Sequence, residues 1–178
     1  MGSGNIFLVG MMGAGKTTIG KALATRLRRE FVDTDKALVE RTGVQVATIF
    51  EIEGEEGFRR RETAVLDELC NHDARVVATG GGVVLAEVNR SRMRESGTVV
   101  YLRARQESLW ERTHLDTTRP LLATPDPKAR IAELLQEREP LYQSAAHVVV
   151  DTGSQSAATL VNRVLAALRD HDPSLVQP

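Results

Sequence analysis

Short apolar runs alternate along the chain with longer segments in which apolar residues recur every three or four positions. Runs without polar alternation are typical of strands covered on both faces, and the longer recurrence is typical of helices packed against a sheet. The runs predict five strands, at residues 6–9, 31–33, 76–79, 99–102 and 148–150. The recurrent segments predict eight helices, at residues 16–29, 36–42, 46–53, 57–71, 87–95, 106–113, 127–142 and 156–170.

This alternation predicts an α/β fold, with one five-stranded parallel sheet flanked by helices on both faces. The length of 178 residues suits a single domain, which we place at residues 1–170. Residues 115–125 break the rhythm with two prolines and three threonines, and they predict a mobile loop within a lid at about residues 112–125. The polar ending at residues 171–178 predicts a frayed tail.

Residues 10–17 read Gly-Met-Met-Gly-Ala-Gly-Lys-Thr and match the phosphate-binding pattern G-x-x-x-x-G-K-[ST] at every position. The match follows a predicted strand and begins a predicted helix, which is the context that the pattern requires. Its glycines let backbone N–H groups surround a phosphate. Lys16 is expected to reach the β- and γ-phosphates and Thr17 to bind Mg²⁺. An accidental glycine turn is the alternative, and the context disfavours it.

Two further segments end predicted strands at the same edge of the sheet, where ligands bind in folds of this class. Asp33 and Asp35 lie two residues apart, so that their carboxylates face one side of an extended chain. One carboxylate could help to hold Mg²⁺ and the other could address an acceptor; alternatively, Asp35 caps the helix that follows. The glycines at 80–82 could let a ligand approach the backbone, or they could form a tight turn without one.

Several arginines are candidates for binding anions. Arg59 and Glu62 are neighbours on a predicted helix and could point together into a site, or the arginine cluster there could be solvated. Arg119 lies in the predicted lid, where closure could bring it onto a transferring phosphate. Arg138 could equally be a surface residue paired with its acidic neighbours.

Composition narrows the class of protein. The formal net charge of −1 gives no overall attraction to nucleic acid or to an anionic membrane. Cys70 is the one cysteine, which rules out an intrachain disulfide and a cysteine-based zinc cluster. The chain lacks a signal peptide and any apolar run of about 18 residues that could span a membrane. We therefore expect a cytoplasmic protein and, without a long apolar surface pattern, a monomer.

About residues 5–170 resemble the shikimate kinase family, a P-loop family of the nucleoside monophosphate kinase-like group. The phosphate-binding segment, Gly-Met-Met-Gly-Ala-Gly-Lys-Thr-Thr-Ile-Gly at 10–20, has a pattern that many kinases share. Five other segments are specific to the family in this order and spacing. They are Asp-Thr-Asp at 33–35, Gly-Glu-Glu-Gly-Phe-Arg at 54–59 with Glu62, Thr-Gly-Gly-Gly at 79–82, Arg-Pro-Leu-Leu at 119–122 and Arg-Glu-Pro-Leu-Tyr at 138–142.

The resemblance implies transfer of the γ-phosphate of ATP, with Mg²⁺, to the 3-hydroxyl of shikimate in aromatic amino-acid biosynthesis. It implies catalytic roles for Asp35, Lys16 and Arg119. Shikimate would be bound by Asp35, Arg59, Gly80, Gly81, Gly82 and Arg138. The nucleotide would be bound by Gly13, Ala14, Gly15, Lys16, Thr17, Thr18, Arg112, Arg119 and Gln155. Mg²⁺ would be held by Thr17 and Asp33.

Two alternatives stay open on the sequence. One is another small-molecule P-loop kinase, such as a gluconate or nucleoside monophosphate kinase; seven aromatic residues offer little for stacking a second base. The other is a nucleotide-binding regulator without catalysis, in which we would expect Lys16, Asp35 or Arg119 to be missing. Residues 116–118 of the lid have no assigned role.

Overall fold

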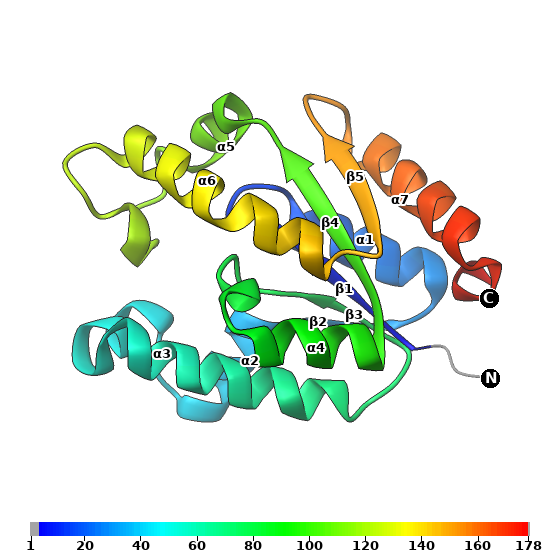
Figure 1. The fold of residues 1–178 in the computed structure, drawn as a ribbon, viewed down its shortest axis with the longest axis horizontal. Coiled ribbons are helices and arrows are strands. Elements are labelled where there is room, and N and C mark those ends of the chain that lie inside the picture. Colours follow the sequence, from blue (N-terminus) through cyan, green and yellow to red (C-terminus); the bar gives the residue numbers. More distant parts are fainter. Residues whose placement is uncertain (1–3, 178) are drawn as a thin grey trace.

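The computed structural model describes residues 4–177, so residues 1–3 of the predicted domain and residue 178 of the predicted tail lie outside the described part. Its centre is one parallel five-stranded sheet with the strand order β2-β3-β1-β4-β5 (Figure 1). The strands are β1 (Asn5–Val9), β2 (Glu30–Asp33), β3 (Arg75–Ala78), β4 (Gly97–Ala104) and β5 (Val148–Thr152). The predicted fold class and all five predicted strands are confirmed.

Helices cover both faces of the sheet (Figure 1). Helices α1 (Lys16–Leu27) and α7 (Ala157–His171) pack together on one face, and α3 (Val46–Cys70), α4 (Glu87–Ser96) and α6 (Pro127–Ala145) lie on the other. Helix α2 (Thr34–Thr42) packs on α3, and α5 (Gln106–Thr113) packs on α6. Three short 3₁₀ helices, η1 (Val83–Leu85), η2 (Pro120–Leu122) and η3 (Pro173–Val176), complete the chain.

The core lies where the central strands meet both helical layers. All five residues of β1 are buried, as are most of the eight residues of β4. This explains why these segments read as continuous apolar runs, since neither face meets water. Because the strands are parallel, the loops after β1, β2 and β3 open at one edge, beside the point where the strand order reverses.

The helices predicted at 46–53 and 57–71 together make up α3. A kink at Gly54, whose φ of 71° and ψ of −178° are not helical, divides the two parts, so the predicted break is confirmed. Glycine adopts this positive φ without strain, which allows the helix to bend sharply at residue 54.

The prediction of a frayed tail is wrong for the described residues. Helix α7 extends to His171, and Asp172 then caps η3 by accepting from the Ser174 N–H. Leu175 is 4% exposed, and its carbonyl accepts from Arg29 Nη2 at 3.2 Å. Leu175 and the partly buried Val176 thus anchor this segment against the core. Within residues 4–177, every helix is too short or too polar to cross a membrane.

His147 makes the stability of this fold depend on pH. Its Nδ1 accepts from the Val99 N–H at 3.0 Å, which requires a neutral imidazole, and burial, with Arg94 and His171 nearby, lowers its pKa. A lowered pKa in the folded state means that the stabilisation is present above the unfolded value of about 6.5 and is lost as pH falls through it. We expect the melting temperature to fall more steeply below about pH 6.5 in the wild type than in His147→Asn, which keeps an acceptor. His72→Asn, at an exposed position, is the control; equal slopes in all three proteins would contradict this role.

Candidate active site

The loop after β1 has the geometry of a phosphate cradle. Gly15, the N-cap of α1, has a φ of 97°, a left-handed conformation that a side chain would strain. The Ala14 N–H donates to the Met11 carbonyl at 3.1 Å and closes the turn, while the N-terminus of α1 faces the cavity. This phosphate cavity, of about 310 Å³, is lined by Gly13, Gly15, Lys16, Thr17, Thr18, Asp33, Asp35, Arg112 and Arg119, among others.

Lys16 lies at the centre of this loop and is almost fully buried. Its Nζ donates to the carbonyls of Gly10 at 2.6 Å and Met11 at 2.9 Å. Its pKa is lowered to about 7, chiefly by burial and also by Arg119 and Arg138, although Asp35 and Asp33 oppose this shift. An anionic phosphate in the cavity would favour the charged form, so the site holds a cation that a phosphate would stabilise.

Asp33 joins the phosphate loop to the next strand. Its Oδ2 accepts from Thr17 Oγ1 at 3.0 Å, and its Oδ1 accepts from the N–H groups of Asp35 and Lys36. The helix cap that the sequence assigned as the alternative role of Asp35 therefore belongs to Asp33. Thr17 and Asp33 thus bring two hard oxygen atoms together beside the phosphate loop.

Asp35 is freed by this capping arrangement to face the cavity. Burial, the largest influence, raises the pKa of its carboxyl, and Asp33 adds to the rise, whereas Lys16, Arg59 and Arg119 oppose it. Asp35 lines both the phosphate cavity and a second, larger one of about 590 Å³. It therefore stands at the boundary between the two.

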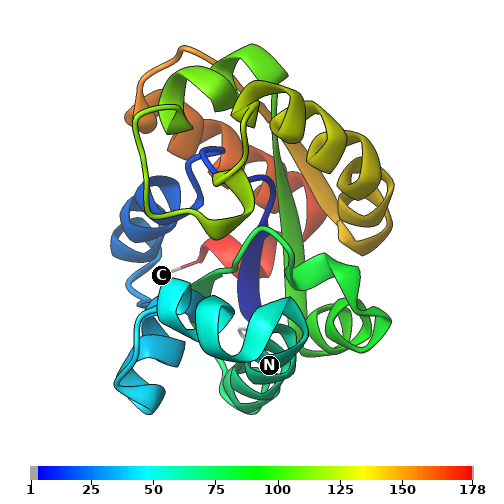
Figure 2. The ribbon, with the colours of Figure 1, turned by 90° about the vertical axis from the view of Figure 1, so that its left-hand side faces the viewer.

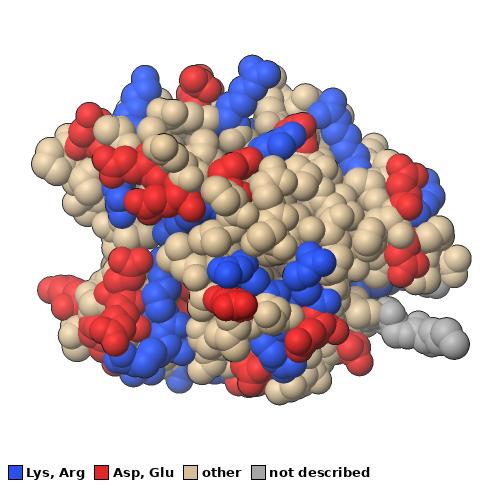
Figure 3. All heavy atoms as spheres, in the orientation of Figure 1, with Lys and Arg blue, Asp and Glu red and all other residues tan. Residues whose placement is uncertain are grey.

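The larger cavity, which we call the acceptor cavity, lies between the first turns of α3 and the lid. It is lined by Asp35, Arg59, Glu62, Gly80, Gly81, Gly82, Asp116, Arg119 and Arg138, with apolar residues such as Phe50 and Phe58. Figure 2 looks toward it with α3 below and the lid above, and Figure 3 shows the hollow between these two parts. The wall that it shares with the phosphate cavity comprises Met12, Asp35, Gly80, Gly81 and Arg119.

Arg59 and Glu62 form a pair within this cavity, as one reading of the sequence predicted. Arg59 Nη1 donates to Glu62 Oε1 at 2.9 Å, and Glu62 is only 2% exposed. Burial raises the pKa of Glu62, while Arg59 lowers it. A Cβ on Gly82 would lie 2.4 Å from the Arg59 guanidinium, so this glycine makes room for the arginine.

Arg138 is not a surface residue. It is 2% exposed within α6, and its Nη1 would lie 3.3 Å from a Cβ on Gly81. The surface pairing that the sequence left open is therefore wrong. The glycines at 80–82 form a turn, in which the Val83 N–H donates to the Gly80 carbonyl at 3.1 Å, and they bring backbone close to two arginines and an aspartate.

Unpaired polar atoms concentrate in the acceptor cavity. Among the described residues, the buried side-chain atoms without a hydrogen-bond partner are Nε of Arg59, Arg119 and Arg138, Nη1 of Arg138 and Oε2 of Glu62. All of these residues line this one cavity. Unpaired buried donors are costly, and four of these five atoms are guanidinium nitrogens that suit a carboxylate or a phosphate.

Arg119 reaches the shared wall from the lid. Its Nε lies 2.9 Å from Asp116 Oδ2, an ion pair that is not aligned as a hydrogen bond. Asp116 Oδ1 accepts from the Thr118 N–H at 2.9 Å and from its hydroxyl at 2.5 Å, and these bonds lower the pKa of Asp116. Residues 116–118, to which the sequence analysis assigned no role, thus form a turn that orients Arg119.

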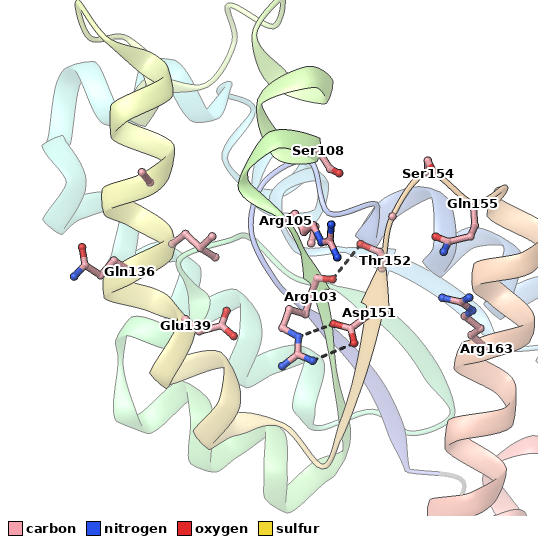
Figure 4. Close-up of a pocket in the computed structure, with 14 residues that line it drawn as sticks. Arg103, Arg105, Ser108, Gln136, Glu139, Asp151, Thr152, Ser154, Gln155 and Arg163 are labelled. Carbon is pink, nitrogen blue, oxygen red and sulfur yellow. Dashed lines mark hydrogen bonds and ion pairs between the residues drawn. The ribbon is translucent and has the colours of Figure 1, made fainter.

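The predicted nucleotide residues beyond the phosphate loop separate into two places. Arg112 Nη1 donates to the Gly13 carbonyl at 2.9 Å and its Nη2 to the Gly153 carbonyl at 2.6 Å, so Arg112 joins the phosphate loop to the β5–α7 loop. Gln155 instead lines a groove of about 890 Å³ between α6, β5 and α7, where Arg103 pairs with Asp151 (Figure 4). The structure does not bring Gln155 to the phosphate cavity, and its contact with adenine stays a prediction.

Two supporting residues were missed on the sequence. Thr34, 2% exposed, accepts from the Gly80 N–H at 3.0 Å and so ties the acidic segment to the glycine loop. Tyr142 donates from its hydroxyl to the Gly81 carbonyl at 2.5 Å. Both residues lie within segments that resemble the family, Asp-Thr-Asp and Arg-Glu-Pro-Leu-Tyr, and this resemblance could have pointed to them. Their hydrogen-bond partners lie far away in the sequence and are known only from the fold.

Comparisons with known proteins agree with this geometry. The model of the shikimate kinase family matches residues 12–169. A shikimate kinase of Nitrosospira multiformis is 55% identical over 166 residues, which is 93% of this chain and 85% of that protein. A structure of shikimate kinase from Acinetobacter baumannii in complex with shikimate is 44% identical, with a TM-score of 0.93 over 95% of this chain and 94% of that one. A gluconokinase structure from Sinorhizobium meliloti has a TM-score of 0.63 at 21% identity, over 97% and 95% of the two chains, and shares the fold alone.

Proposed function

The chain belongs to the shikimate kinase family, and from this premise we propose how its residues divide the reaction between them. It is an enzyme that phosphorylates shikimate with ATP as co-substrate, a step of aromatic amino-acid biosynthesis. The observation that carries the residue assignment is the group of unpaired buried atoms in the acceptor cavity. Shikimate is a small anionic polyol, and such a ligand would satisfy those guanidinium donors.

On the acceptor side, Arg59 and Arg138 bind the carboxylate of shikimate, and residues 80–82 approach its ring. Asp35 accepts a hydrogen bond from the 3-hydroxyl and takes its proton as the phosphoryl group is transferred. Its raised pKa supports this role, because a more basic carboxylate is a better proton acceptor. Glu62 holds Arg59 in place.

On the nucleotide side, the N–H groups of residues 13–18 and Lys16 bind the phosphates of ATP, and Arg112 borders the adenine. Lys16 and Arg119 stabilise charge on the phosphoryl group in transit. The position of Arg119 at the wall between the two cavities supports this assignment.

Mg²⁺ fits the oxygen atoms beside the phosphate loop. Thr17 Oγ1 and Asp33 Oδ2 are hard donors 3.0 Å apart, and Mg²⁺ is often held by one or two protein oxygens together with substrate phosphates. These two residues would hold the ion, and the ion would neutralise part of the negative charge of the phosphates.

We place the catalytic domain at residues 1–170 and the lid at about residues 112–125. We also propose a monomeric enzyme with a small-molecule partner, shikimate. Use of ATP supports a location in the cytoplasm.

A coupled assay of ADP release tests the acceptor. Shikimate, quinate, gluconate and a nucleoside monophosphate are each offered with ATP and Mg²⁺, and ADP release should depend on shikimate. ADP release at the same rate without shikimate, or a preference for gluconate, would contradict the proposed function.

Arg138 offers a second test. Since it contributes charged hydrogen bonds to the carboxylate, Arg138→Met should raise the KM for shikimate roughly 10- to 150-fold and change the KM for ATP little. Arg60→Met is the matched control, because Arg60 pairs with Glu56 in solvent, with 68% of its side chain exposed. Steady-state kinetics with each substrate varied in turn measure both constants; equal increases in the two KM values would contradict the assignment.

A further inference from the structure

Tyr142 is a buried phenol that the proposed mechanism does not use. It is 0% exposed on α6, one helical turn after Arg138, and its hydroxyl donates to the Gly81 carbonyl at 2.5 Å. Within residues 4–177 this is the one hydrogen bond that joins α6 to residues 80–82. The two assigned shikimate-binding elements, the glycine loop after β3 and Arg138 on α6, therefore meet at this phenol.

The spacing between these two elements is tight. Arg138 Nη1 would lie 3.3 Å from a Cβ on Gly81, so a shift of the loop by about one ångström would change the contact between the guanidinium and the loop backbone. Helix α6 also contains Pro140, which has no N–H to donate and leaves the helix without one of its internal bonds beside Arg138. Contacts outside the helix must therefore help to fix this turn.

Tyr101 supplies one of those contacts. Its ring stacks on the ring of Tyr142, with centroids 5.0 Å apart and planes at 22°, and its hydroxyl donates to the Glu139 carboxylate. The two phenols are alike in burial and stacking. They differ in what they hold, since Tyr101 holds α6 to β4 and Tyr142 holds α6 to the glycine loop.

We propose that Tyr142 is a positioning residue for the acceptor: its hydroxyl fixes the Gly81 carbonyl so that the glycine loop and Arg138 keep the spacing that shikimate needs. This inference rests on the proposed function. It assigns to Tyr142 an effect on shikimate binding that a purely structural tyrosine would not have. No residue of α6 lines the phosphate cavity, so loss of the phenol should change the KM for ATP much less than the KM for shikimate.

The test compares Tyr142→Phe with Tyr101→Phe, since each variant keeps the ring and removes one buried hydroxyl. Both should lower the melting temperature, because each removes a hydrogen bond to a partly buried oxygen atom. Only Tyr142→Phe should raise the KM for shikimate, by about tenfold, with the KM for ATP changed by less than about twofold. Shikimate affinity without ATP, measured by calorimetry below both melting temperatures, should fall by the same factor.

Unchanged shikimate KM and affinity in Tyr142→Phe would overturn the inference, and so would equal increases in the two variants. Those outcomes leave the proposed function intact as long as the wild type phosphorylates shikimate. A wild type that does not phosphorylate shikimate would overturn the proposed function and this inference with it.

Discussion

Replacing Asp35 by Asn should lower kcat for shikimate phosphorylation by roughly 10²- to 10⁴-fold, the usual contribution of a general base. The amide keeps the size of the side chain but cannot accept the proton of the attacking hydroxyl. Nucleotide affinity should change little, because the phosphate loop is held by its own backbone and by Lys16. Turnover by coupled ADP release and ATP affinity by calorimetry measure the two effects separately.

Glu40→Gln is the matched control, because it removes a carboxylate from the exposed side of the same helix. Stability provides a further check on Asp35→Asn. Because the pKa of Asp35 is raised in the folded state, its ionisation costs stability as pH rises above its ordinary value of 3.8. The variant should therefore melt no lower than the wild type at neutral pH, and its turnover should lose the acidic limb of the pH profile. Loss of ATP binding together with turnover would show that Asp35 has another role.

Arg119→Met should lower kcat by roughly 10³-fold, near the lower end of the range for arginines that stabilise a transferring phosphoryl group. Arg119 lines both cavities, and among the described residues its one ion pair is with Asp116 in the lid. It can therefore leave Asp116 for a phosphate without disturbing the core. Rapid mixing of the variant with ATP and shikimate, followed by product quantification, measures the transfer step directly.

Two variants bracket this prediction. Arg119→Lys keeps the charge and loses the planar fork, so its rate should lie between those of the wild type and Arg119→Met. Arg130→Met removes an arginine that pairs with Glu133 near the start of α6, and it should retain the wild-type rate. Similar kcat values for Arg119→Met and Arg130→Met would exclude Arg119 from phosphoryl transfer.

The phosphate side of the site could be predicted from the sequence because its chemistry is local. Residues 10–17 are contiguous, and the conformations that they need follow from glycine spacing. Asp33 and Asp35 were also recognised as candidates. Which of them caps α2 and which faces the cavity depends on which carboxylate reaches the N–H groups of α2, and the spacing of the two residues does not decide that. A side-chain cap is decided by backbone dihedrals at the end of β2, which only the fold sets.

The acceptor side depends on contacts between distant parts of the chain. Arg138 lies among charged residues that suggest an exposed helix, yet it is buried because α6 crosses over the loop after β3. The resemblance of its motif to a family, and not its pattern of charge, placed it in the site. Leu175 was missed for the converse reason, since two adjacent apolar residues in a polar tail give no periodic signal and find their contacts only after α7 has packed.

The strand order β2-β3-β1-β4-β5 has a consequence for how such a protein can diverge. The segments that follow β2 and β3 line the acceptor cavity, and the lid and Arg138, which follow β4, line it as well. The loop that follows β5 instead contacts Arg112 and lies outside this cavity. Substitutions after β2 and β3 can therefore alter the acceptor cavity and leave the β5–α7 loop unchanged. Redesign of acceptor specificity should accordingly begin with α2, α3 and the glycine loop, and Arg138 should be changed last, because its helix also contacts the glycine loop through Tyr142.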